Sequence, residues 1–168
     1  TDRVLRTMSE DASRHAAEYL GHLMVDVKLN TTMVSYDNNI VKFANGEEVY
    51  CETLIWTAGI IGEAIEGFDK SVYARGGRFI VDSFNRVKGY DDVFALGDIA
   101  YLESPQYPHG YPQLAQVAIQ QSKCLAKNLN SGKFEKEFEY NDKGSMATVG
   151  RNRAVADLHK LHMFGRPA

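Results

Sequence analysis

The chain has 168 residues, 44% of them hydrophobic, and carries a formal net charge of −3 at pH 7. This length and composition suit a globular protein, and the slightly acidic balance gives no reason to expect nucleic acid as a partner. No apolar run approaches the roughly 20 residues that span a bilayer, and we expect neither a transmembrane helix nor a signal peptide.

The first predicted element is a helix from Ser9 to Leu23. Its apolar residues recur three and four positions apart, which buries one face. Ser9 is a suitable N-cap, and Glu10 and Asp11 complement the positive end of the helix dipole.

Short apolar segments follow this helix and are typical of a small β meander. Asn45-Gly46 is a strong hairpin signal between two of them. A further strand-like run, Thr53 to Thr57, ends at Ala58-Gly59, and we expect Trp56 within it to be a core residue. The meander segments are Val25–Leu29, Met33–Tyr36, Ile40–Phe43 and Glu48–Tyr50.

The centre of the chain predicts a strand around Phe79 to Val81, a loop, and a short buried strand from Val93 to Leu96. Gly97 and Asp98 then stand at the carboxyl end of that strand, where open α/β sheets bind ligands. Gly97 permits close approach of a ligand to the backbone, and Asp98 offers acceptor oxygens to a polyol hydroxyl. Taken alone, the same residues also fit an ordinary turn.

A second helix is predicted from Pro112 to Leu129. One face carries Leu114, Ala118, Gln121, Leu125 and Leu129, and a second stripe carries Gln113, Gln116 and Gln120. Beyond it, Phe138–Tyr140 and Met146–Val149 indicate a hairpin. The end of the chain is locally basic through Lys143, Arg151, Arg153, Lys160 and Arg166, which is either a solvated face or the edge of a contact with an anionic membrane.

In this order and spacing, four motifs are similar to the C-terminal portion of type II NADH:quinone oxidoreductases. They are Thr57-Ala58-Gly59, Gly77 to Arg86, the Val93 to Asp98 run, and Ala-Gln-x-Ala-x-Gln-Gln from Ala115 to Gln121. The Gly-Asp pair belongs to the wider FAD/NAD-binding pyridine nucleotide-disulfide oxidoreductase superfamily, whereas the glutamine run is narrower. Met24 and Ser122 depart from the pattern, since the family usually has glycine at both positions.

The resemblance implies an α/β fold, mixed α+β in this chain, that is part of a flavoprotein fold with two dinucleotide-binding domains. Residues 1–56 then correspond to the end of the NADH-binding domain and residues 57–140 to the C-terminal part of the FAD-binding domain. Residues 141–168 correspond to the start of a membrane-associating region.

The resemblance also implies the site residues. The FAD-contacting positions are Gly59, Gly97, Asp98, Gln113, Leu114, Ala115 and Gln116, and the quinone-lining positions are Gln120 and Gln121. Asp98 would hold the ribityl and phosphate region, while the start of the second helix would stabilise negative charge on the reduced flavin ring. We expect no catalytic side chain, because the flavin carries the chemistry. We also expect no metal site, because Cys51 and Cys124 form no Cys-x-x-Cys pair.

The implied function is transfer of electrons from NADH through FAD to a membrane quinone in a respiratory chain, without proton pumping. The implied location is peripheral, on the cytoplasmic side of the cell inner membrane, with attachment through a segment beyond this chain. The sequence contains no Gly-x-Gly-x-x-Gly turn, so we expect the chain alone not to hold NADH in the usual way and to be inactive. Apolar surface left uncovered predicts self-association or a homodimer.

Two alternatives remain open. One is a related FAD-dependent reductase of the sulfide:quinone or ferredoxin type. Cys51 and Cys124 argue against the sulfide enzymes, which use a cysteine pair, because these two residues lie far apart and form no Cys-x-x-Cys motif. The other alternative is a non-catalytic interaction module, which a bound yellow flavin would exclude.

Overall fold

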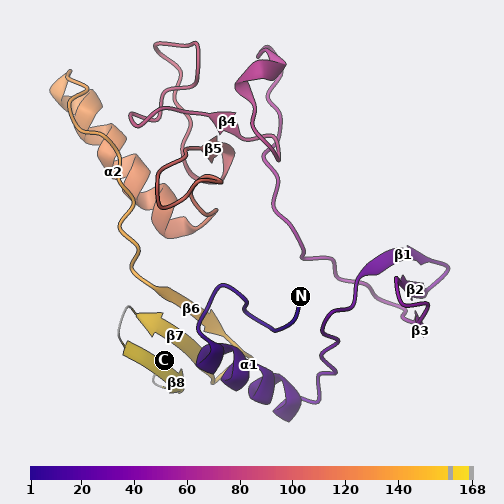
Figure 1. The fold of residues 1–168 in the computed structure, drawn as a ribbon. Coiled ribbons are helices and arrows are strands. Elements are labelled where there is room, and N and C mark those ends of the chain that lie inside the picture. The colour runs from indigo at the N-terminus through magenta and orange to yellow at the C-terminus, as the bar shows by residue number, and fades with distance from the viewer. Residues whose placement is uncertain (159–160, 167–168) are drawn as a thin grey trace. The chain divides into compact units, whose positions relative to one another are not determined.

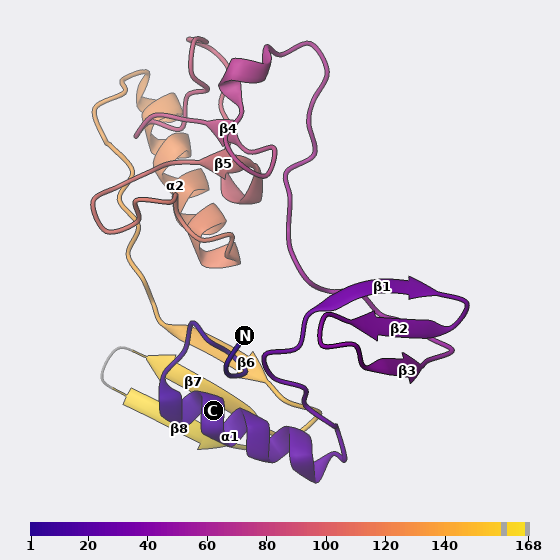
Figure 2. The same cartoon turned by 45° about the vertical axis from the view of Figure 1, so that its right-hand side comes forward.

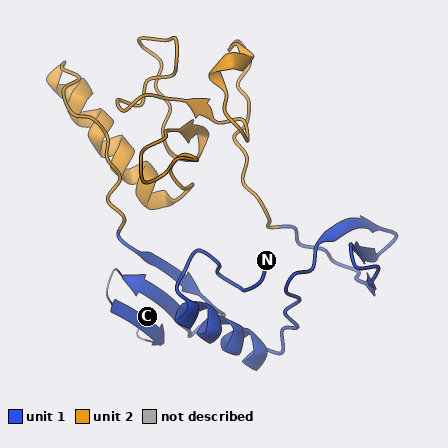
Figure 3. Ribbon diagram, viewed as in Figure 1, with its two compact units in different colours: residues 1–56, 143–168 blue, residues 57–142 orange. Residues whose placement is uncertain are grey.

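The computed structural model describes residues 1–158 and 161–166. The chain divides into two compact units, coloured separately in Figure 3. Unit 1 consists of residues 1–56 and 143–168, and unit 2 of residues 57–142. Each unit has its own hydrophobic core.

Unit 1 begins with helix α1, Glu10–His22, which confirms the first predicted helix. The Ser9 hydroxyl accepts a hydrogen bond from the Ala12 amide, as expected of an N-cap. At the other end, Met24 has a left-handed backbone with φ of 60°. The Met24 amide donates to the Gly21 carbonyl and the Val25 amide to the Leu20 carbonyl, which is the Schellman arrangement that glycine usually closes.

The buried face of α1 packs on an antiparallel sheet of β6 (Ser145–Thr148), β7 (Ala154–Leu158) and β8 (Leu161–Gly165), visible in Figures 1 and 2. Ala12, Ala16 and Val155 are almost fully buried between them. The predicted pairing of Phe138–Tyr140 with Met146–Val149 is wrong, because β6 pairs with β7 instead. Phe138 and Tyr140 are buried in unit 2 by aromatic packing rather than by strand pairing.

Unit 1 also contains the meander of β1 (Met33–Asp37), β2 (Ile40–Phe43) and β3 (Glu48–Tyr50). Asn38 and Asn39 both have positive φ and close the first hairpin, while Gly46 closes the second. Val25–Leu29 was predicted as a strand of this meander and is not one. None of the described residues forms a ladder with it, and a strand requires one.

Unit 2 is built from the parallel pair β4 (Phe79–Ile80) and β5 (Ala100–Tyr101), two short 3₁₀ helices, η1 (Lys70–Val72) and η2 (Gly97–Ile99), and helix α2 (Ala115–Ser131). The second predicted helix is therefore present but begins three residues after Pro112. The Leu114 amide donates to the Pro112 carbonyl, so a tight turn comes before the first helical residue. Gly132 ends the helix with φ of 66°.

The face of α2 that is buried differs from the predicted one. Leu114 and Leu129 are exposed, and the buried residues are Val117, Gln121, Cys124, Leu125 and Asn128. The face of α2 that packs against the interior of unit 2 thus contains two amide side chains, Gln121 and Asn128. Neither helix in the described part of the chain combines the length and apolar composition needed to cross a bilayer.

Two predicted strands of the central region are not regular strands. Val93–Leu96 forms no ladder with the described residues; Phe94 makes an isolated bridge to Arg86, and backbone hydrogen bonds join Val93 to Val87 and Ala95 to Asn85. Thr53–Thr57 pairs with none of the described residues, and Trp56 within it is 63% exposed rather than in the core. Both segments have strand-like sequences, but the structure supplies no full ladder for either.

Candidate functional site

The turn at Gly97 and Asp98 lies where η2 joins β5 in unit 2. Gly97 is buried and has φ of 70°, a conformation that a side chain disfavours. A Cβ atom at Gly97 would lie 3.0 Å from the Cβ of Ala118 on α2. Glycine is therefore required both by the backbone conformation and by the close approach of α2.

Asp98 is exposed, and its carboxylate makes no hydrogen bond or ion pair with any residue that the structure describes. The buried Arg78 supplies positive charge nearby, and burial lowers the pKa of its guanidinium although the charge of Asp98 opposes this shift. Arg78 Nε donates to the Ala100 carbonyl at 3.0 Å, and one of its terminal nitrogens donates to the Tyr111 carbonyl at 3.0 Å. The turn thus presents a free carboxylate in a locally positive setting.

The N-terminus of α2 is the second component of the site. Its N-cap, Leu114, provides no side-chain hydrogen bond, and the first turn holds no acidic residue. The positive end of the helix dipole is therefore not neutralised by its own sequence. Gln113 connects this end to the turn, because its Nε2 donates to the Asp98 carbonyl at 3.1 Å.

The remaining predicted site residues are placed differently. Gln121 is 1% exposed, and its Oε1 accepts from the Gly97 amide at 2.7 Å. Gln120 exchanges two hydrogen bonds with the backbone of Asn141, at 2.9 and 3.0 Å. Gly59 has φ of 86°, and nothing lies within 4 Å of the position that a Cβ atom there would take. Ala115 is exposed and Gln116 half-buried in the first turn of α2.

Arg78 was not identified as a functional residue from the sequence. The signal available was a cationic side chain next to a predicted buried strand, since a buried guanidinium must find acceptors. Its acceptors are two backbone carbonyls that are distant in sequence, so the pairing becomes visible only in the fold.

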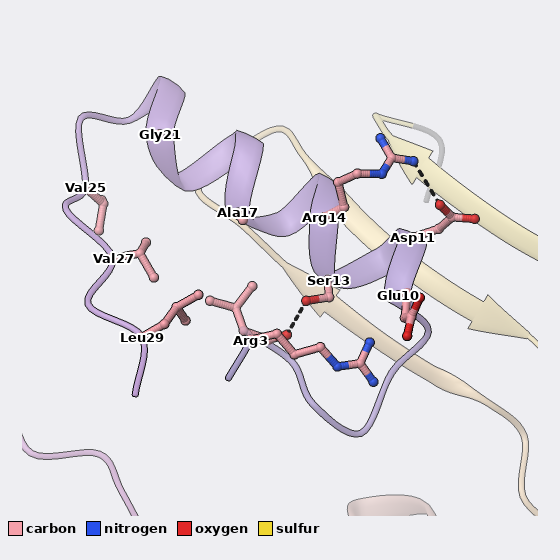
Figure 4. Close-up of a pocket in the computed structure, with 11 residues that line it drawn as sticks. Arg3, Glu10, Asp11, Ser13, Arg14, Ala17, Gly21, Val25, Val27 and Leu29 are labelled. Carbon is pink, nitrogen blue, oxygen red and sulfur yellow. Dashed lines mark hydrogen bonds and ion pairs between the residues drawn. The ribbon is translucent and has the colours of Figure 1, made fainter. Parts of the chain in front are cut away.

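A pocket of about 690 Å³ lies between α1 and residues 25–29, away from the Gly97 and Asp98 turn, and is shown in Figure 4. Some of its polar groups pair with each other or with the backbone: Ser13 donates to the Val4 carbonyl at 2.7 Å, and Asp11 pairs with Arg14 at 2.9 Å, whereas Arg3 Nη1 has no hydrogen-bond partner among the described residues. Apart from Arg3 and Glu10, the rest of its wall is apolar, so these two side chains are the groups that could orient a ligand there. Across the described ranges, no cluster of His, Cys, Asp and Glu is suited to a metal ion.

Comparison with known proteins finds a matching family and curated relatives for this chain. A sequence profile described as pyridine nucleotide-disulphide oxidoreductase matches residues 1–122. A type II NADH:quinone oxidoreductase of Mycobacterium tuberculosis is 34% identical over 96% of this chain and 37% of its own length. Its counterpart in Staphylococcus saprophyticus is 29% identical over 99% of this chain and 42% of its own length. The resemblance inferred from the motifs is confirmed, and the chain spans about two fifths of these relatives.

Solved structures show the same fold. The NDH2 from Plasmodium falciparum in complex with NADH superimposes with a TM-score of 0.81 at 19% identity, covering 98% of this chain and 49% of that one. An NAD-dependent persulfide reductase from A. fulgidus gives a TM-score of 0.72 at 20% identity, covering 93% of this chain and 29% of that one. The predicted fold class, a mixed α/β chain that is part of a two-dinucleotide-binding flavoprotein fold, is confirmed.

Proposed function

The chain belongs to the pyridine nucleotide-disulphide oxidoreductase family, and from that premise we propose that it forms the C-terminal portion of a type II NADH:quinone oxidoreductase. The complete protein would transfer electrons from NADH through FAD to a membrane quinone. The observation that carries this proposal is the Gly97 and Asp98 turn packed against the open N-terminus of α2. The names of the curated relatives support the choice of donor and acceptor.

The residues at this turn fit FAD. The unpartnered Asp98 carboxylate is an acceptor for the hydroxyls of a polyol chain, and the absence of a side chain at Gly97 lets the turn pack closely on Ala118 of α2. The exposed start of α2, at Leu114 and Ala115, favours negative charge nearby. When bound, FAD supplies the hydride and electron chemistry, while Gln113 and Gln116 would help to orient it. Gly59 remains a proposed contact on the strength of the motif alone.

Binding of NADH is proposed for the complete protein rather than for this chain. The 168 residues contain no Gly-x-Gly-x-x-Gly turn with which to hold a pyrophosphate. The proposed domain assignment places residues 1–56 at the end of the NADH-binding domain and residues 57–140 in the FAD-binding domain. The chain by itself is proposed to be inactive.

For the quinone, Gln120 and Gln121 remain proposed positions. Gln120 is half-buried, and its amide would have to exchange the Asn141 backbone for a quinone carbonyl. Gln121 is enclosed in the interior of unit 2 with its carbonyl oxygen already engaged. Of the two, Gln120 is therefore the better placed to meet a ligand.

Peripheral attachment to the cytoplasmic side of the inner membrane is also proposed. Residues 141–168 would begin the membrane-associating region, and Lys143, Arg151, Arg153 and Arg166 supply positive charge there. Lys160, counted with them in the sequence, lies outside the described residues. A homodimer is proposed on the basis of exposed apolar side chains.

The test is a visible absorption spectrum and an assay of quinone reduction by NADH, both on the complete protein that contains this chain. We expect a stoichiometric flavin band and NADH-dependent reduction of quinone. Reduction of ferredoxin in place of quinone would overturn the choice of acceptor. A colourless protein after incubation with excess FAD would overturn the flavoprotein proposal and favour the interaction module.

A further inference from the structure

The backbone from Gly97 to Ala100 is held by three long polar side chains that come from different parts of unit 2. Gln121 accepts from the Gly97 amide, Gln113 donates to the Asp98 carbonyl, and Arg78 donates to the Ala100 carbonyl. Gln121 and Arg78 are buried, so their bonds to the turn are shielded from water. The direction of the Asp98 side chain therefore depends on residues that do not touch its carboxylate.

Gln121 is the most deeply enclosed of the three. It lies on the buried face of α2 together with Val117 and Cys124, three residues beyond the Ala118 methyl that limits the space at Gly97. The distance between Gln121 Oε1 and the Gly97 nitrogen is 2.7 Å. Without this acceptor the buried amide of Gly97 would lose its hydrogen bond, and such groups are strongly disfavoured in a protein interior.

We propose that Gln121 is a positioning residue, which fixes the Gly97 amide through its carbonyl oxygen and so aims the adjacent Asp98 carboxylate at FAD. The inference rests on the proposed function for the identity of the ligand. A neutral amide is suited to the task, because it provides an acceptor without burying a second negative charge next to Asp98.

Holding the turn and contacting a quinone directly would use different atoms of the Gln121 amide. A quinone carbonyl accepts hydrogen bonds, so it would require the NH₂ group of Gln121. Holding the turn requires only the oxygen. Gln121→Glu keeps a carbonyl acceptor and removes the NH₂ group, and burial favours the neutral, protonated form of the introduced carboxyl, so no second negative charge is added next to Asp98. Gln121→Met preserves the approximate shape and removes both groups.

Asn128 offers a matched control on the same helix. It is also buried, and its amide exchanges hydrogen bonds with the Lys136 backbone at 2.8 and 3.2 Å. Asn128→Leu therefore removes a buried amide-to-backbone connection of α2 that does not involve Gly97. It measures the cost of disturbing this face of the helix without disturbing the turn.

The first measurement is amide hydrogen exchange, residue by residue, in the 168-residue chain. We expect the Gly97 amide to exchange about tenfold faster or more in Gln121→Met, and within about threefold of the unmodified chain in Gln121→Glu. Asn128→Leu should leave the exchange of Gly97 relative to neighbouring core amides unchanged. Unaltered exchange at Gly97 in Gln121→Met, or equal acceleration in Asn128→Leu, would overturn the proposal.

The second measurement is the dissociation constant for FAD in the complete protein. We expect it to rise about tenfold in Gln121→Met and to be largely restored in Gln121→Glu. Equal weakening in both variants would show that the amide nitrogen matters and would overturn the proposal. If the unmodified protein binds no FAD, the proposed function fails, while the exchange of Gly97 still decides whether Gln121 holds the turn.

Discussion

Gly97 and Asp98 have different roles in the turn: one shapes the backbone, and the other carries an exposed charge. Gly97 supplies the backbone geometry, since its φ of 70° and the neighbouring Ala118 leave no room for a side chain. Asp98 supplies the exposed charge and takes no part in holding the turn through its carboxylate. The charge of Asp98 is therefore available for binding a ligand and is not needed for folding, so a substitution there tests binding separately from stability.

Asp98→Ala is expected to weaken FAD binding by the complete protein at least about tenfold, because a charge-assisted hydrogen bond contributes roughly 1.5–3 kcal/mol. The free energy of unfolding should change by less than about 1 kcal/mol, as is usual for an exposed side chain. Flavin retained after gel filtration measures the first quantity, and denaturant unfolding the second. Asp91→Ala removes another exposed carboxylate as a control. Full retention of flavin in Asp98→Ala would contradict this assignment.

Asp157 links the start of α1 to the sheet of unit 1. Its carboxylate accepts from the Ser9 amide at 2.7 Å, from the Ser9 hydroxyl at 2.9 Å, and lies 2.7 Å from His162 Nδ1. Burial alone would raise the pKa of Asp157, but the hydrogen bonds from Ser9 and His162 outweigh burial and lower it. The charged form is therefore favoured in the folded chain.

A folded-state pKa below the unfolded value means that Asp157 stabilises the fold above the unfolded pKa of about 4, and that this stabilisation is lost as the pH falls through the folded value. Asp157→Asn should therefore lower the free energy of unfolding by about 1–3 kcal/mol at pH 7. The difference from the unmodified chain should shrink as the pH is lowered from 5 toward 3. Denaturant unfolding over this range tests the expectation, and a difference that grows on acidification would refute it.

At the scale of elements, agreement with the sequence depends on whether an element is stabilised locally. Helix α1 matches its prediction because its apolar spacing and its Ser9 cap both lie within the segment. The hairpins of β1 to β3 form at the turns with Asn and Gly. Val93–Leu96 and Thr53–Thr57 lack regular ladders, because pairing partners must come from elsewhere in the chain.

Backbone strain lies just after α1, at Met24, where the resembling family usually has glycine. Met24 is 93% exposed and left-handed, so its side chain contributes almost no packing while its backbone is unfavourable. We expect Met24→Gly to raise the free energy of unfolding by about 1 kcal/mol. Met24→Ala, which loses the same side chain but keeps the strained backbone, should leave it almost unchanged. Equal effects in thermal or denaturant unfolding would show that the backbone conformation is not the cause.

At the scale of the whole molecule, one segment stands out: the residues between β3 and η1 expose several large apolar side chains. They are Ile55, Trp56, Ile60, Ile61 and Ile65. Soluble proteins seldom leave so many neighbouring apolar side chains uncovered without a partner surface. Self-association follows as the expectation for the 168-residue chain.

Sedimentation equilibrium should show an average mass that rises with protein concentration. The double change Ile60→Ser with Ile61→Ser should shift the equilibrium toward the monomer, because it removes two of these exposed side chains. Ile119→Ser, at an exposed position of α2, is the control and should leave the mass unchanged. A chain that stays monomeric at all concentrations would contradict the expectation.

Sequence alone determined the features that depend on neighbouring residues. They include the presence of both helices, the Ser9 N-cap of α1, the turns of the meander, and the Gly97 and Asp98 motif that pointed to the family. These features are predictable because apolar periodicity and capping act within about one or two turns of chain.

Tertiary structure decided which side chains of those elements face the interior. The resemblance gives Gln120 and Gln121 the same role beside a quinone, yet the fold bonds Gln121 to the Gly97 amide and Gln120 to the backbone of Asn141. The tertiary structure also pairs β6, β7 and β8 into the sheet on which α1 packs, and it gives Val25–Leu29 no strand partner among the described residues. Burial and hydrogen-bond partners are set by residues distant in sequence, and no local pattern contains them.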